Sequence, residues 1–127
     1  MLLMDGARCA VPADVRVGVK LWLSLDGKGV FGEGKWRLLD AIHRTGSLRA
    51  AADALGISYR KAWGDLRDAE RALGVTFLER RRGGAEGGES RLSDTGRKWL
   101  TEYARFRTEC KLYTERAFAR WKERMGT

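Results

Sequence analysis

Residues 45–63, Thr-Gly-Ser-Leu-Arg-Ala-Ala-Ala-Asp-Ala-Leu-Gly-Ile-Ser-Tyr-Arg-Lys-Ala-Trp, decide how this chain folds. Ser47 and Ser58 are of a residue type that caps helix N-termini, and Gly56 between them suits the left-handed end of a helix. The stretch therefore predicts a short helix from Leu48 to about Leu55, a sharp turn, and another helix that begins after Ser58.

The flanking residues extend this pattern to three helices. An earlier helix should end near Thr45-Gly46, and its apolar positions are Trp36, Leu38, Leu39 and Ile42. The helix after Ser58 should end at Gly74, and its inward positions are Ala62, Leu66, Ala69 and Leu73. The small pair Ala51-Ala52 lies where two of these helices must cross closely.

The N-terminal part of the chain predicts a strand or hairpin after a loose arm. Residues 1–14 contain the single proline and little pattern, as a flexible arm would. Apolar and polar residues alternate from Val15 to Leu25, which is typical of a half-buried strand. Asp26–Gly29 has turn chemistry, and Val30-Phe31 is expected to return as a short partner strand.

A second hairpin is predicted after the third helix. Val75–Arg80 is expected as one strand and Ser90–Leu92 as the other, joined by a long tip that contains the glycines of residues 83–88. Two helices, a sharp turn, a third helix and a hairpin follow one another as in a winged helix-turn-helix, whose third helix enters the major groove of DNA. We therefore expect a mainly α fold with a small β wing, its DNA-binding domain spanning residues 15–93.

One long helix is predicted from residues 94–127, beginning at Ser93 or Asp94. It carries an apolar stripe at spacings of four and three, formed by Trp99, Tyr103, Phe106, Cys110, Tyr113 and Ala117. The stripe either folds back onto its own domain or pairs with a second chain. Its length favours pairing, so we expect a homodimer built on this helix.

The charge balance favours a polyanionic partner. The 127 residues include 25 Lys and Arg against 17 Asp and Glu, a formal net charge of +8, which suits nucleic acid first and an anionic membrane surface second. The opening residues do not form a signal peptide, and no stretch approaches a membrane span. Cys9 and Cys110 lie far apart and outside any metal-ligand pattern. We expect a cytoplasmic, nucleoid-associated protein without a metal or cofactor.

The residues expected to contact double-stranded DNA lie on the helix starts, the third helix and the wing. They are Ser47, Ser58, Tyr59, Arg60, Lys61, Trp63, Arg67, Arg80, Arg81 and Arg82. Arg60 has the reach to read guanine and Lys61 to bind phosphate. Trp63 is equally suited to packing within the domain. The wing arginines are suited to the minor groove or backbone, although a solvated edge strand is the rival reading.

The block of residues 45–63 resembles the N-terminal domain of the ModE family of molybdate-responsive regulators, with LysR-type regulators as relatives. The resemblance continues at Leu78-Glu79-Arg80, Gly83-Gly84, Gly87-Gly88, Leu92 and Thr95-Gly96. It implies DNA binding and dimerisation. Members of that family bind the oxyanion in C-terminal barrel domains, and this chain ends at Thr127. We therefore expect no molybdate sensing here, and no small-molecule effector is evident.

An enzyme is not expected. Gly29–Lys35 has the spacing of a phosphate-binding loop, but Trp36 occupies the position of the Ser or Thr that would hold Mg²⁺. His43 is the single histidine and has no partner pattern for catalysis. The sequence predicts a dimeric bacterial transcription regulator that reads two half-sites. The alternative is an accessory protein that pairs with a full-length regulator or binds DNA without sequence preference.

Overall fold

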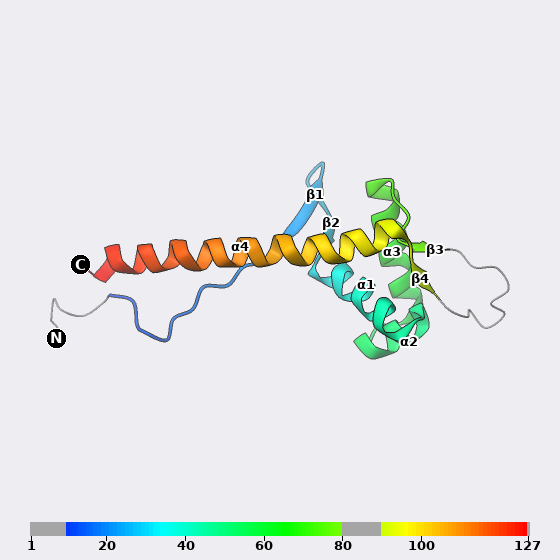
Figure 1. Ribbon diagram of the computed structural model, residues 1–127, viewed down its shortest axis with the longest axis horizontal. Coiled ribbons are helices and arrows are strands. Elements are labelled where there is room, and N and C mark those ends of the chain that lie inside the picture. The colour runs from blue at the N-terminus through cyan, green and yellow to red at the C-terminus, as the bar shows by residue number, and fades with distance from the viewer. Residues whose placement is uncertain (1–9, 80–89, 127) are drawn as a thin grey trace. The chain divides into compact units, whose positions relative to one another are not determined.

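The computed structural model describes residues 10–79 and 90–126. Its elements, labelled in Figure 1, are β1 (Trp22–Leu25), β2 (Lys28–Gly32), α1 (Glu33–Thr45), α2 (Leu48–Leu55), α3 (Tyr59–Leu73), β3 (Leu78–Glu79), β4 (Arg91–Leu92) and α4 (Asp94–Gly126). Two compact units emerge from the contacts. Residues 21–104 form the larger one, and the N-terminal residues through Lys20 form the smaller one together with α4 from Arg105 onward.

The three predicted helices are confirmed, and their ends are closed by the expected residues. The Ser47 hydroxyl accepts a hydrogen bond from the Ala50 amide at 2.9 Å, and the Ser58 hydroxyl accepts one from the Lys61 amide at 3.0 Å. Left-handed glycines end the helices, namely Gly46, Gly56 and Gly74 with φ of 86°, 71° and 69°. Each cap satisfies backbone groups that a helix end leaves without an intrahelical partner.

In the larger unit, a hydrophobic core forms among α1, α2 and α3, with further members from β2, β4 and the first part of α4. Its most deeply buried members are Phe31, Leu38, Leu39, Ile42, Ala51, Ala52, Ala62, Leu66, Ala69, Phe77 and Leu92. Ala51 and Ala62 are both 0% exposed, so small side chains let α2 and α3 pack closely. This packing holds α3 on a rigid base.

An aromatic layer joins the start of α4 to this core. The Phe31 ring lies 4.8 Å from that of Trp99 and 5.2 Å from that of Tyr103, measured between centroids. The Tyr103 hydroxyl donates to the Leu21 carbonyl at 2.8 Å, and the Trp36 indole donates to the Leu100 carbonyl at 2.9 Å. Both polar groups are thus satisfied at the edge of the core, as buried Tyr and Trp require.

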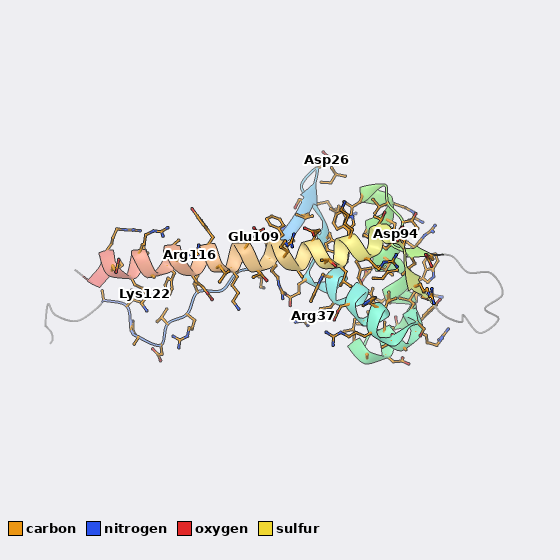
Figure 2. The ribbon with its side chains drawn as sticks, viewed as in Figure 1. Asp26, Arg37, Asp94, Glu109, Arg116 and Lys122 are labelled. Atoms are coloured by element: carbon orange, nitrogen blue, oxygen red, sulfur yellow. The ribbon has the colours of Figure 1, made fainter. Side chains whose placement is uncertain are left out.

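The strand expected at Val15–Leu25 is shorter than predicted. β1 begins at Trp22, which pairs with Gly32, the last residue of β2. Since α1 begins at Glu33, β2 offers no backbone partner to residues before Trp22, and alternation alone does not make a strand. The predicted turn is confirmed: Asp26 and Gly27 have φ of 52° and 79°, and Figure 2 shows Asp26 at the tip of the hairpin.

The strand expected at Val75–Arg80 begins later than predicted, because β3 covers Leu78–Glu79 and Arg80 lies outside the described residues. The amides before it are engaged by α3. The Val75 amide donates to the Glu70 carbonyl at 3.1 Å, and the Phe77 amide donates to the Glu70 carboxylate at 2.7 Å. These two amides therefore bond to α3, although the sequence pattern placed them in the hydrogen-bond ladder of a strand. β4 likewise starts at Arg91 rather than at Ser90.

α4 begins at Asp94, as predicted, and its start is tightly fixed. The Ser93 hydroxyl accepts from the Gly96 amide at 2.9 Å and donates to the Thr76 carbonyl at 2.5 Å. A Cβ on Gly96 would collide with the Phe77 carbonyl, so only glycine fits at this crossing. Among the described residues, no helix is both long and apolar enough to cross a membrane.

The described part of the smaller unit includes residues 10–20, part of which was expected as a loose arm. The Val15 amide donates to the Pro12 carbonyl at 3.2 Å, which closes a turn over Ala13 and Asp14. Val11 is buried. These residues therefore have local order within their unit, whereas residues 1–9 of the expected arm lie outside the described chain.

Candidate nucleic-acid interface

The outward face of α3 is defined by the residues that bury its other side. Ala62, Leu66 and Ala69 pack against the core. Because a helix turns through about 100° per residue, the positions opposite these three face away from the core. The outward positions are Arg60, Gly64, Arg67, Asp68 and Arg71, of which Gly64 and Arg67 are half-buried and the other three are exposed. This face therefore presents three guanidinium groups and one carboxylate around one glycine.

Arg60 is the outward cation nearest to the start of α3. It is exposed and makes no hydrogen bond or ion pair with any residue in the described part of the chain. Its five donors and planar fork therefore remain available to an external acceptor. Arg71 is also exposed, and it lies 3.8 Å from the Asp68 carboxylate. A surface pair of this kind is weak.

Two aromatic residues on one flank of α3 hold arginines by their faces. The Arg49 guanidinium lies 4.4 Å from the Tyr59 ring centroid, and the Arg67 guanidinium lies 4.8 Å from the Trp63 centroid. Tyr59 and Trp63 are themselves partly buried against the core. These rings restrict two long cationic side chains before any ligand arrives, which lowers the entropy cost of using them.

Lys61 lies on the other flank of α3. Its ammonium group is 3.1 Å from the Asp65 carboxylate, and both side chains are substantially exposed. An exposed pair of this kind contributes little to stability, so the lysine can exchange the carboxylate for a phosphate at low cost.

Ser47 and Ser58 place polar side chains at the starts of α2 and α3. Each hydroxyl already accepts a backbone hydrogen bond as a cap. A hydroxyl that accepts still has its own proton to donate. The helix starts also carry a positive dipole end, so both positions suit an anionic ligand.

Arg49 is a residue that the sequence reasoning missed. It follows the Ser47 cap by two positions and lies in the first turn of α2, on the exposed side, where it reaches across to Tyr59. The sequence signal that could have indicated it is a cation in the first turn of a helix, just after the Ser47 cap and before the expected turn. Arg80, Arg81 and Arg82 of the predicted wing lie outside the described residues, which resume at Ser90.

The predicted apolar stripe of α4 divides between two environments. Tyr103 is 4% exposed and Trp99 is half-buried, and both pack within the core of the larger unit. Phe106 and Tyr113 are 44% and 68% exposed. Cys110 and Ala117 are half-buried. The stripe that remains open along α4 therefore starts at Phe106.

Further aromatic and charged groups extend along the same half of α4. The Phe118 and Trp121 rings stack with centroids 5.7 Å apart, and the Lys122 ammonium lies 5.4 Å from the Phe118 centroid. Figure 2 shows Glu109, Arg116 and Lys122 along this part of the helix. Aromatic and charged side chains thus lie close together on this segment.

The segment with phosphate-loop spacing, Gly29–Lys35, is not a loop, since it spans the end of β2 and the first turn of α1. His43 is exposed in the last turn of α1. Within residues 10–79 and 90–126, no three His, Cys, Asp or Glu residues gather as metal ligands would.

Comparison with known proteins matches residues 34–97 to the family described as bacterial regulatory helix-turn-helix protein, lysR family. The molybdenum transport protein ModE of Azotobacter vinelandii is 29% identical over 107 residues, covering 84% of this chain and 40% of that protein. The molybdenum-pterin-binding protein MopB of Rhodobacter capsulatus is 38% identical over 66 residues, covering 52% of this chain and 24% of that protein. The chain therefore spans less than half the length of these relatives.

Among solved structures, the DNA-binding domain of CbnR in complex with DNA is similar, with a TM-score of 0.54 and 23% identity. The alignment covers 68% of this chain and 93% of that domain. The predicted fold, a mainly helical winged helix-turn-helix with a long C-terminal helix, is confirmed. The resemblance to ModE-type and LysR-type sequences is confirmed as well.

Proposed function

We propose that this chain, which belongs to the lysR family of bacterial regulatory helix-turn-helix proteins, regulates transcription by binding duplex DNA as a homodimer with α3 in the major groove. The observation that carries this proposal is the outward face of α3. Arg60 and Arg71 are exposed on a helix whose opposite side is packed on the core, and Arg67 lies half-buried between them along the helix, so cations are presented on a rigid support. A recognition helix needs both properties.

The outward residues divide into two roles. Arg60 has no partner among the described residues and reads guanine through its O6 and N7 acceptors. Lys61, Arg49 and the hydroxyls of Ser47 and Ser58 bind phosphates and fix the register of the protein on the duplex. Arg80, Arg81 and Arg82 of the wing add contacts to the backbone or the minor groove.

Dimerisation is supported by the exposed half of α4. Phe106 and Tyr113 lie seven residues apart on one face, with Cys110 between them and Ala117 one turn beyond Tyr113. This spacing is that of a helix pairing seam, and exposed aromatic patches of this kind usually mark interfaces. A second copy of the chain covers the seam and brings two copies of α3 onto two half-sites. Such a regulator meets its DNA in the bacterial cytoplasm.

The test is selection of binding sites from random duplexes with the purified chain, followed by fluorescence anisotropy on the enriched site. We expect a site with two related half-sites. Affinity should fall steeply between about 50 and 200 mM salt, because lysine and arginine displace counterions from phosphates. Failure to enrich any sequence, or an affinity independent of salt, would remove the proposal.

A further inference from the structure

Gly64 occupies the interior of α3, where a glycine needs an explanation. Glycine is a poor helix former, because the unfolded chain loses more conformational freedom at glycine than at alanine. The other glycines near it have a reason in the fold. Gly56 and Gly74 have positive φ values that suit glycine, and Gly96 lies too close to the Phe77 carbonyl for a side chain.

None of these reasons applies to Gly64. It lies within the regular helix Tyr59–Leu73 and does not have a positive φ. A Cβ at this position would meet no atom within 4 Å. The described structure would therefore accept alanine at residue 64, and alanine would favour the helix.

The long cationic side chains on either flank of Gly64 are held away from it. Residues 63 and 65 lie about 100° to either side of it around the helix axis. The Arg67 side chain is held over Trp63 on one flank, and the Lys61 side chain is held by Asp65 on the other. Both tethers draw a long side chain away from Gly64, which is half-buried. Asp68, one turn later on the same face, is short and pairs with Arg71, so no long side chain is anchored over the backbone of residue 64.

We infer that Gly64 is a close-approach position that sets how deeply α3 enters the major groove. This inference deepens the proposed function and depends on it. Without a side chain at residue 64, the helix backbone comes within contact of a base-pair edge, and Arg60 and Arg67 reach the bases on either side. Glycine is the residue that permits such an approach of backbone to a ligand.

The experiment measures stability and DNA binding of Gly64→Ala in the full chain. The melting temperature should rise by about 3 to 5 °C, because alanine favours the helix. Affinity for the site selected with the wild-type chain should fall about tenfold, a loss similar to that of one mismatched base pair. Gly64→Leu, which adds a larger side chain, should lose more affinity than Gly64→Ala.

Gly34→Ala is the matched control, because Gly34 also lies in a helix with open space around its Cα and does so on α1. It should not lose stability, and it should bind DNA like the wild type. A wild type that binds no duplex would refute the proposed function. A wild type that binds its site while Gly64→Ala binds equally well, or melts at a lower temperature, would overturn this inference alone. A matching loss of affinity in Gly34→Ala would overturn it too.

Discussion

The two halves of α4 present the same kind of residue pattern in opposite environments. In the first half, Tyr103 is 4% exposed and donates its hydroxyl proton to the Leu21 carbonyl. In the second half, Tyr113 is 68% exposed. Both residues belong to one stripe with spacings of three and four. Periodicity therefore identifies the face of a helix that must be covered, and tertiary contacts decide what covers it.

The difference also separates two energetic roles. Burial of Tyr103 with Phe31 and Trp99 stabilises the fold of a single chain. Phe106 and Tyr113 can gain comparable burial only when something else packs on them. The first half of the stripe is thus expected to govern folding and the second half assembly. The following predictions test this division, from the largest expected effect to the smallest.

Tyr103→Ala should destabilise the fold by about 3–5 kcal/mol, since it empties a buried aromatic site and leaves the Leu21 carbonyl without its donor. Urea denaturation should show this loss at every protein concentration. The matched variant Tyr113→Ala should weaken stability in a concentration-dependent manner, because its burial requires a second chain. Equal and concentration-independent losses for the two tyrosines would contradict the division.

Phe106→Asp should dissociate the dimer, because a buried charge in the seam costs several kcal/mol of desolvation unless the chains separate. At micromolar protein concentration, analytical ultracentrifugation should show a dimer for the wild type and a monomer for the variant. The variant should also lose tight DNA binding. Leu112→Asp is the control: Leu112 is exposed and lies about 130° around the helix axis from the stripe, so its variant should remain dimeric. A monomeric wild type would show that the exposed stripe does not pair chains.

Arg60→Ala should cost about 1–3 kcal/mol of binding free energy at one base pair in each half-site and relax the preference there. Arg81→Ala in the wing, outside the described residues, should instead lower the affinity for all DNA sequences by the same factor. Anisotropy on the selected site and on random duplex separates the two effects. If both variants lose the same on both duplexes, the assigned roles of α3 and the wing are wrong.

Ser58→Ala should cost about 1 kcal/mol of folding stability, because it removes the acceptor for the Lys61 amide at the start of α3. Thermal melting should reveal a small decrease, and Ser58→Asp, which restores a capping acceptor, should recover most of it. A Ser58→Ala variant as stable as the wild type would mean that water replaces the cap.

The helices were predictable from the sequence because hydrogen bonds between residues a few positions apart fix where each helix begins and ends. Ser47, Gly56, Ser58 and Gly74 each act through bonds to residues a few positions away. The strands were overestimated because a strand depends on a partner far along the chain. Nothing near Val15 indicates that β2 ends at Gly32, and nothing near Val75 indicates that Glu70 engages the following amides.

The candidate site was predictable in part, for the same reason. The outward position of Arg60 follows from helix geometry once the inward alanines are identified. The stacking of Arg49 on Tyr59 joins α2 and α3 across the turn. The residues next to Arg49 or Tyr59 in the sequence do not indicate this contact. The predicted roles in DNA and dimer contacts remain predictions, and so do those of Arg80, Arg81 and Arg82.

The short segment before β3 is hydrogen-bonded to α3 on one side and to the residue before α4 on the other. The Glu70 carboxylate near the end of α3 accepts from the Phe77 amide, while Ser93, just before α4, bonds the carbonyls of Thr76 and Phe77. The backbone of Thr76 and Phe77 therefore connects α3 to the start of α4 through hydrogen bonds. A movement of the first turn of α4 within this unit must therefore either shift the segment that follows α3 or break one of these hydrogen bonds.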